Sequence, residues 1–243
     1  MKLKYHSISD AGLRRNNNED MAMVADSLVR DGEDSFSFQL PDEGIKFGAI
    51  VCDGVGGLPN GELASEIACG KFRTFVEELP DDMDDNALIQ ALKLWTRETN
   101  ADILTESNGS GMACTLTGIL LYYDRAYILN IGDSRTYRLR YGTLRQLTTD
   151  HSERDRTGDM SIPTSIIYNC LGIQDCFIDV TPTRVVAGDV FVVCSDGLSD
   201  VVPEESLASI LAGESRTAEE LIEAAKAAGA PDNVTVILLE FSE

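Results

Sequence analysis

The stretch IKFGAIVCDGVGG, residues 45–57, decides the fold. Its first nine residues form an apolar run that ends on Asp53, which is typical of a buried strand. The glycine-rich loop DGVGG follows, and apolar residues at helical spacing from about 60 to 79 predict a helix with Asn60 as its N-cap. An aspartate beside a glycine at a strand end offers a carboxylate and an accessible backbone carbonyl at one edge of a sheet.

Three more aspartates stand at the ends of apolar runs. They are Asp20 before MAMVAD, Asp196 after VFVVCS and Asp232 before NVTVILLEF. Two unit charges 4 Å apart repel by roughly 4 kcal/mol near a protein surface, so carboxylates gathered at one sheet edge favour protonation or a bound cation. The first hypothesis is therefore a metal site in which oxygen ligands hold two divalent ions and which catalyses hydrolysis.

The Asp-Gly pair alone is a weak signal because it is common in turns, and the chain has a further example at Asp31-Gly32. Asp53 and Asp196 differ because each directly ends a strand-like run. The loop DGVGG lacks the Lys-Ser/Thr of a Walker loop and does not fit G-x-G-x-x-G, so its leading aspartate favours metal over nucleotide. The polar stretch GLRRNNNED, 12–20, is either a solvated loop or part of the site. In the second case an arginine would bind a phosphate next to an aspartate that orders a metal-bound water.

Composition narrows the class of protein. The 243 residues carry a net charge of −21, which argues against a basic face for nucleic acid or for an anionic membrane. No apolar run reaches membrane-span length and the N-terminus has no signal-peptide pattern, so the expected location is the cytoplasm. The six cysteines form no C-x-x-C pair and indicate reduced, buried thiols. We expect one domain over 1–243, without a linker.

The pattern of elements predicts an α+β fold. Strands are predicted at 2–9, 21–26, 45–53, within 113–148, and at 176–183, 189–195 and 233–241, and helices at about 60–79, 84–106, 203–212 and 217–229. The segments 30–44 and 150–164 are polar, the first with one alternating patch. Strands grouped as meanders with helices in two pairs favour two mainly antiparallel sheets with helices outside.

Six motifs in order carry a family resemblance. They are G-x-x-R-x-x-N-E-D at 12–20, D-G-x-G-G at 53–57, G-D-S-R at 132–135, L-T-x-D-H-S at 147–152, S-D-G-L-x-D at 195–200 and D-N-x-T at 232–235. Together they resemble the PPM family, the metal-dependent 2C-type serine/threonine protein phosphatases, over essentially the whole chain. The resemblance implies a four-layer α-β-β-α sandwich, two stacked antiparallel sheets flanked by helix pairs.

The resemblance also implies the main site residues. Asp53 would bridge two Mn²⁺ or Mg²⁺ ions, the carbonyl of Gly54 would complete one of them, and Asp196 and Asp232 would bind the other. Arg15 matches the arginine that binds the substrate phosphate, so Arg15 and Asp53 are the expected catalytic pair. Oxygen-only ligands favour Mg²⁺ or Mn²⁺ over zinc. A water activated by both ions would attack phosphorus in line, without a phosphoenzyme.

Further ligands follow from the same resemblance. Asp20, with Glu19, would hold metal-bound waters, and Asp133 and Asp200 match ligands of a third ion. The implied substrate is a phosphorylated protein, and the implied setting is signalling opposite a serine/threonine kinase. We expect a monomer that binds neither nucleic acid nor membrane.

The sequence departs from the family pattern in three places. Val55 stands where many eukaryotic members have a histidine proposed as general acid, which makes the chain resemble bacterial members and leaves the proton donor unassigned. The family's G-S/T-T strand start reads G-M-A-C-T at 111–115. The segment after His151, up to Asn169, is short for the helical flap of bacterial relatives, and His151 itself is expected to be structural.

Two alternatives stay open at this point. One is a catalytically silent module of the same fold that binds or regulates, although such modules commonly lose at least one of the acidic residues retained here. The other is a calcium-binding acidic domain without chemistry, which the absence of a D-x-D-x-D-G loop disfavours.

Overall fold

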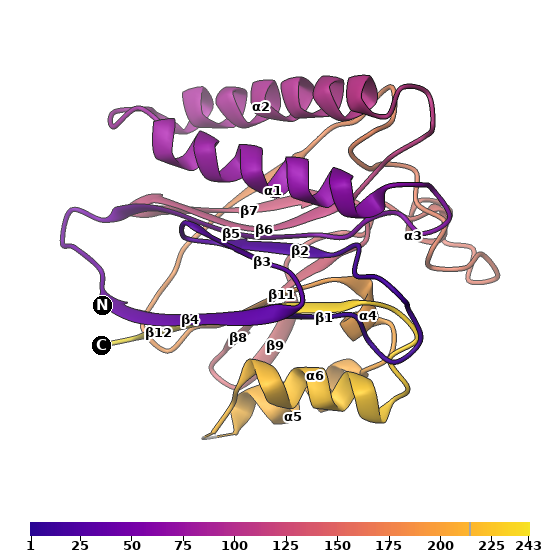
Figure 1. The fold of residues 1–243 in the computed structure, drawn as a ribbon. Helices are drawn as coiled ribbons and strands as arrows, with labels where there is room; N and C mark the ends of the chain where they lie inside the picture. The colour runs from indigo at the N-terminus through magenta and orange to yellow at the C-terminus, as the bar shows by residue number, and fades with distance from the viewer. Residues whose placement is uncertain (214) are drawn as a thin grey trace.

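A computed structural model describes residues 1–213 and 215–243. Two six-stranded sheets lie face to face between two pairs of helices (Figure 1). This arrangement confirms the α-β-β-α sandwich that the sequence predicts.

The first sheet contains both terminal strands, and its neighbouring strands are all antiparallel. Its spatial order is β4 (Gly32–Gln39), β1 (Lys2–Asp10), β12 (Val234–Ser242), β11 (Val190–Cys194), β8 (Arg135–Arg140) and β9 (Thr143–Gln146). The pairing of β1 with β12 brings the two ends of the chain together in one sheet.

The second sheet is also antiparallel between all its neighbours. Its spatial order is β10 (Asp179–Thr183), β7 (Arg125–Ile131), β6 (Leu116–Tyr123), β5 (Ile45–Cys52), β2 (Met21–Val24) and β3 (Ser27–Val29). The strand quoted at the start of the sequence analysis, β5, therefore lies inside this sheet, as its apolar character requires.

The long helices cover the outer faces of the sheets (Figure 1). They are α1 (Gly61–Glu78) and α2 (Asp85–Glu106) on the second sheet, and α5 (Glu204–Ala212) and α6 (Ala218–Ala227) on the first. The short helices α3 (Glu153–Thr157) and α4 (Asp196–Ser199) lie at the end of the sandwich opposite the two termini (Figure 1). Among the described residues, no helix is both long enough and apolar enough to cross a bilayer.

Three apolar layers hold the four structural layers together. Between α1, α2 and the second sheet lie Phe72 and Trp95, whose rings meet edge to face with centroids 5.2 Å apart. Between the sheets lie alternate residues of the central strands, including Phe191 of β11. Between the first sheet and α5 and α6 lies the third layer, which includes Tyr137 and Leu221.

The two long N-terminal helices start in different ways. Asp84 caps α2 by accepting a hydrogen bond from the backbone N–H of Ala87 at 2.8 Å. Asn60 stands before α1 as predicted, but its backbone is left-handed (φ 60°) and its side chain makes no capping hydrogen bond. The expectation that Asn60 caps α1 with its side chain is therefore wrong; its backbone carbonyl accepts the first helical hydrogen bonds, from the N–H groups of Leu63 and Ala64.

Local elements differ from the sequence prediction at three points. The polar segment 30–44 contains an eight-residue edge strand, β4, in which every residue is exposed or only partly buried. The segment 150–164 contains α3, which Ser152 caps by accepting from the N–H of Asp155 at 3.1 Å. The S-D-G-L motif forms the single turn α4 directly after β11.

The cysteines are free thiols, as expected. All six lack a disulfide, and five of them are buried. Burial raises the pKa of Cys194, two residues before Asp196, to about 12. These side chains therefore pack as small apolar groups.

Glycine spacing in the central strands gives a test of the fold. A Cβ on Gly118 of β6 would lie 2.2 Å from the carbonyl oxygen of Ala49, whereas one on Gly70 of α1 would meet no atom within 4 Å. Gly118→Ala should lower the free energy of unfolding by about 1–3 kcal/mol because β5 and β6 must separate. Gly70→Ala, the matched control, should raise it by up to about 1 kcal/mol through helix propensity.

Denaturant unfolding of the two variants measures both effects. Equal stability of Gly118→Ala and the unaltered chain would contradict the close pairing of β5 and β6.

Candidate active site

The aspartates singled out in the sequence meet at one end of the sandwich, between the sheets. We call this group the acidic edge; it comprises Asp20, Asp53, Asp133, Asp196, Asp200 and Asp232. Four of these carboxylates, with Arg15 and Gly54, line a cavity of about 240 Å³, and the four are Asp53, Asp133, Asp196 and Asp232. Asp20 lies completely buried behind the cavity.

Strand register brings these residues together. Met21 of β2 pairs with Cys52 of β5, so Asp20 and Asp53, the residues next to that pair, become neighbours across the second sheet. In the first sheet Cys194 of β11 pairs with Val236 of β12, which brings the turn after β11 next to the turn before β12. Asp196 and Asp232 stand in those two turns.

The Asp53 carboxyl is the centre of the group. It lies within hydrogen-bonding reach of both Asp20 and Asp196. Burial, followed by repulsion from Asp20, Asp196, Asp133 and Asp232, raises the pKa of Asp53 well above its ordinary value. Burial likewise raises the pKa of Asp196 well above its ordinary value and that of Asp20 to about 6.

The donor set fits a divalent cation. One oxygen of Asp20 and one of Asp196, Oδ1 in each, are buried without a hydrogen-bond partner in the described part of the chain. Buried carboxylate oxygens without a donor are costly, and a hard cation with oxygen ligands is the group that relieves both the repulsion and the missing bonds.

The distances between the carboxylates of the acidic edge favour ions held by few protein ligands over an ion enclosed by several carboxylates. Within residues 1–213 and 215–243, no three of its carboxylates offer oxygens that all lie within 4.8 Å of one another. An ion here would therefore be held by carboxylates in pairs, together with water or a backbone carbonyl, as magnesium commonly is.

Arg15 reaches into the site from the loop after β1. Its Nη2 donates a hydrogen bond to Oδ2 of Asp232 at 2.6 Å, and both side chains are about one-third exposed or more. Arg15 is also close to Gly56 of the glycine-rich loop. Its guanidinium thus faces the cavity, but it shares with Asp232 an ion pair that the sequence did not predict. Arg14 is exposed and does not line the cavity.

A buried hydroxyl network supports Asp20. Ser195 Oγ donates to Oδ2 of Asp20 at 2.7 Å and accepts from the backbone N–H of Thr235 at 3.0 Å. The Thr235 hydroxyl meets that of Ser9 at 2.8 Å, and Asn18 donates to Ser9 at 2.9 Å. Sequence reasoning gave these residues no role, although Ser195, Thr235 and Asn18 each belong to one of the motifs.

Asn233, next to Asp232, fixes the arginine loop. Its side-chain oxygen accepts from the N–H of Glu19 at 2.9 Å, and its amide donates to the carbonyls of Ala11 and Asn17 at 3.0 and 2.9 Å. The D-N-x-T motif therefore positions the G-x-x-R-x-x-N-E-D loop, which explains why an asparagine follows the aspartate.

Glu19 lies beside the glycine-rich loop. Its carbonyl accepts from the N–H of Gly54 at 3.2 Å and from the hydroxyl of Ser65 at 2.6 Å. A Cβ on Gly54 would lie 2.8 Å from that of Glu19 and 2.7 Å from the backbone of Gly61. Glycine is thus required where β5 passes α1, and this close approach keeps Gly54 next to the acidic edge.

Asp133 stands in a turn that two side chains brace. Arg135 donates from Nε and Nη2 to Oδ2 of Asp150 at 2.9 and 2.7 Å. His151 Nδ1 accepts from the N–H of Gly132 at 3.1 Å, while Nε2 faces Asp179 at 3.1 Å. Burial raises the pKa of Asp133 to about 7. Both nitrogens of His151 are engaged within the protein, as a structural role requires.

The segment after α3 forms one wall of the cavity. Ser165 and Ile167 line it, and Thr164 donates to Oδ2 of Asp200 at 3.1 Å. Asp200 thereby links this segment to the acidic edge of which it is a member. The sequence offered no signal for these contacts because the segment is polar and lacks periodicity.

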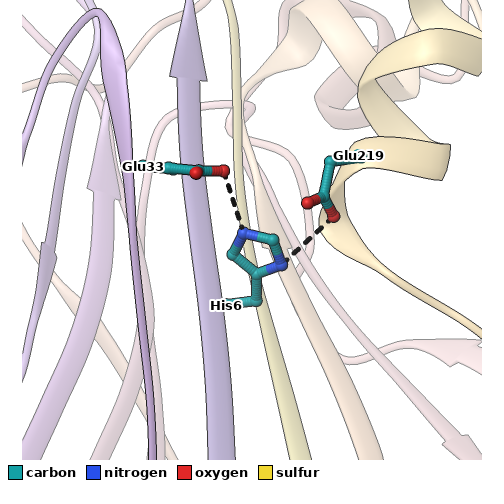
Figure 2. Close-up of side chains that lie close together, drawn as sticks. All are labelled: His6, Glu33 and Glu219. Carbon is teal, nitrogen blue, oxygen red and sulfur yellow. Dashed lines mark ion pairs between the residues drawn. The ribbon is translucent and has the colours of Figure 1, made fainter.

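A second group of metal-ligand side chains lies elsewhere, on β1, β4 and α6. Figure 2 shows the ring of His6 between two carboxylates, with Glu33 facing Nε2 at 3.5 Å and Glu219 facing Nδ1 at 3.2 Å. In this arrangement each glutamate faces a different nitrogen of the same imidazole, so the closest contacts are with the ring itself. The group is better described as ion pairs that attach α6 to β1.

Comparison with known proteins agrees with the geometry. A family model described as Protein phosphatase 2C matches residues 30–228. The serine/threonine protein phosphatase PstP of Mycobacterium tuberculosis is 32% identical over 98% of this chain, which spans only 45% of that relative. The serine/threonine phosphatase stp of Listeria monocytogenes is 32% identical over 79% of this chain and 83% of its own length.

Solved structures show the same fold. The crystal structure of M. tuberculosis PstP/Ppp superposes with a TM-score of 0.80 at 31% identity, with full coverage of both chains. The PstP catalytic domain in complex with two manganese ions gives 0.79 at 30% identity, also with full coverage. The S. agalactiae serine/threonine phosphatase gives 0.83 at 25% identity over 99% of this chain and 100% of that chain.

The raised pKa of Asp20 predicts a pH effect in chelator. Because its folded-state pKa, about 6, lies above its ordinary 3.8, the stability it contributes is present at low pH and lost as pH rises to about 6. The loss should be on the order of 3 kcal/mol. Asp20→Asn should therefore lose less stability than the unaltered chain between pH 4 and pH 7.

Denaturant unfolding at several pH values measures the difference. Added Mn²⁺ should remove the loss in the unaltered chain, because a bound cation compensates the ionised carboxylates. The same pH slope in Asp20→Asn and the unaltered chain would refute the buried, repelled state of Asp20.

Proposed function

The chain belongs to the protein phosphatase 2C family, and we propose that it hydrolyses phosphoserine and phosphothreonine in proteins with two divalent metal ions. The observation that carries this proposal is the convergence of Asp20 and Asp196 on Asp53 beside a cavity that Arg15 also lines. Relatives that match most of the chain are named serine/threonine phosphatases, and one solved relative holds two manganese ions. We further propose that residues 1–243 act as a single phosphatase domain.

The proposed ligands follow from the position of each group. Asp53, at the centre of the acidic edge, would contact both ions, and the adjacent Gly54 carbonyl would contribute to one of them. Asp196 and Asp232 would hold the other. All are oxygen donors, which suits Mn²⁺ or Mg²⁺.

Further carboxylates would surround the proposed ligands and hold water or a third ion. Asp20, supported by Ser195, would order water near Asp53, with Glu19 beside the glycine-rich loop. Asp133 and Asp200 would form a looser third site, which the segment after α3 contacts through Thr164.

Bound metal ions supply an activated water nucleophile and neutralise charge on the phosphoryl group. The chain's own residues orient the reaction. Asp53 and its neighbours set the direction of attack, and Arg15 holds the phosphoryl oxygens by the two parallel bonds that a guanidinium can donate. For that role Arg15 must share or leave Asp232, its present partner at 2.6 Å. A substrate phosphate would thus release a carboxylate for the metal.

The substrate would be a protein that a serine/threonine kinase has phosphorylated, and the phosphatase would reverse that modification. The open cavity is bordered by the segment after α3, so the side chains flanking the phosphorylated residue would contact that segment. We propose that one chain suffices, since Arg15 and the aspartates proposed as ligands line one cavity within it.

The proposal is tested by hydrolysis of a phosphothreonine peptide with Mn²⁺ and then with a chelator. Activity should require the metal, and Asp196→Asn should lower kcat by at least about 100-fold. The matched control is Asp102→Asn on the exposed face of α2, which should keep full activity. Asp196→Asn should stay folded by circular dichroism because the substitution removes a buried charge.

Two outcomes would count against this function. Turnover that survives the chelator would exclude a metal-dependent reaction. A folded protein that binds Mn²⁺ but turns over no phosphopeptide would favour a catalytically silent binding module.

The role of Arg15 is tested by substitution. Arg15→Ala should raise KM for the phosphopeptide by roughly tenfold or more, the effect of losing a charge-assisted hydrogen bond to phosphate. Arg15→Lys should recover part of the loss, because it restores the charge without the fork. Arg14→Ala, the exposed neighbour, should leave KM unchanged. If Arg14→Ala and Arg15→Ala behave alike, Arg15 does not grip the phosphate.

A further inference from the structure

The β8–β9 hairpin is unusually basic for this chain. Residues 135–145, RTYRLRYGTLR, contain Arg135, Arg138, Arg140 and Arg145 and no acidic residue, although the whole chain has a net charge of −21. The hairpin forms an outer edge of the first sheet. The proposed phosphatase reaction uses none of these four arginines directly.

Two of the four arginines are neutralised. Arg135 pairs with Asp150, and Arg140 holds the fully buried Asp189 by two hydrogen bonds of 2.6 Å. In the described part of the chain, neither Arg138 nor Arg145 forms an ion pair within 4 Å. Two guanidinium charges at this edge are therefore left uncompensated.

The strand register places these two charges face to face. Arg138 of β8 pairs directly with Arg145 of β9. Directly opposed residues have Cβ atoms about 4.5–5.5 Å apart, and like charges in such a pair are destabilising. Arg140 follows two residues along on the same face as Arg138. If the exposed position 145 served stability alone, a carboxylate opposite Arg138 would be more favourable than a second arginine.

Arg138 is also poorly satisfied as a donor. Its Nε is buried without a partner among the described residues, and its Nη1 makes only a long bond of 3.4 Å to the hydroxyl of Thr183 on β10. Burial, together with the charges of Arg140 and Arg145, lowers the pKa of Arg138, and the charge of Asp189 opposes this shift. A guanidinium has five donors, so most of its capacity is unused.

We propose that Arg138 and Arg145, with the Thr183 hydroxyl, bind a tetrahedral oxyanion, a free phosphate or a phosphoryl group, at this sheet edge. Two unpaired guanidinium groups match the double charge of phosphate, and each can donate two parallel hydrogen bonds to it. The site is separate from the acidic edge, since Arg138 lies five residues beyond Asp133, roughly 15 Å along the strand. A nucleic acid is a poor ligand because the rest of the chain is strongly acidic.

The test measures thermal stability of the full chain in Mg²⁺ at low ionic strength, with increasing inorganic phosphate. The unaltered chain should gain stability, and Arg145→Gln and Arg138→Gln should weaken phosphate binding at this site at least about tenfold, as loss of a charge-assisted bond implies. Arg97→Gln, an exposed arginine on α2, is the matched control and should keep the full gain. Without phosphate, Arg145→Gln should melt higher than the unaltered chain, because the opposed charges are relieved.

The Arg15→Ala variant separates this site from the acidic edge. Phosphate-dependent stabilisation that persists in Arg15→Ala but is lost in Arg145→Gln supports the proposal. Full stabilisation in both Arg138→Gln and Arg145→Gln, or a lower melting temperature of Arg145→Gln without phosphate, would overturn it. This result is independent of phosphatase activity, so failure of either proposal leaves the other standing.

The source of the anion is distinguished with a peptide that carries the non-hydrolysable phosphonate analogue of phosphoserine. Binding tighter than inorganic phosphate by an amount that depends on Arg145 identifies a protein-borne phosphoryl group. Equal or weaker binding that still depends on Arg145 identifies free phosphate.

Discussion

Electrostatic repulsion among buried carboxylates is the constraint on which this structure depends. Asp53 lies within reach of both Asp20, which is fully buried, and Asp196, which like Asp53 is partly buried; this arrangement opposes folding while the three groups are charged. The three apolar layers of the sandwich and the hydroxyl network around Ser195 hold them in place. The repulsion lowers the stability of the fold without ions. It also raises the affinity of the site for cations, because a bound ion removes the repulsion.

The antiparallel sheets make this convergence possible from distant parts of the chain. Because β1 pairs with β12, the loop that carries Arg15 lies beside Asp232 and Asn233, more than 200 residues later. Because β2 pairs with β5, Asp20 lies beside Asp53. Each pairing is fixed by apolar residues that must face a core layer, and a slip of one residue would turn them outward. The register of the core thus fixes the geometry of the acidic edge.

Much of this could be predicted from sequence where a pattern has a physical cause. The apolar runs of β5, β11 and β12 and the helical spacing of α1 and α2 identify the layers, and the aspartates at the strand ends identify the acidic edge. The β4 strand was missed because an edge strand exposed to solvent lacks a strong apolar alternation. The left-handed backbone of Asn60 was not predicted, because asparagine before a helix is typical both of a side-chain cap and of a left-handed residue. The ion pair between Arg15 and Asp232 also required the fold, since two residues in distant motifs give no sign that they touch.

The two termini lie at the end of the sandwich remote from α3 and α4 (Figure 1). Asp232 of the acidic edge precedes β12, whose far end pairs with the start of β1. Both terminal strands are neighbours in one sheet, so their ends leave the molecule side by side. A polypeptide joined to either end would therefore begin at the end of the sandwich opposite α3 and α4. The length of β12 thus separates both chain ends from Asp232 and from the cavity that Asp232 lines.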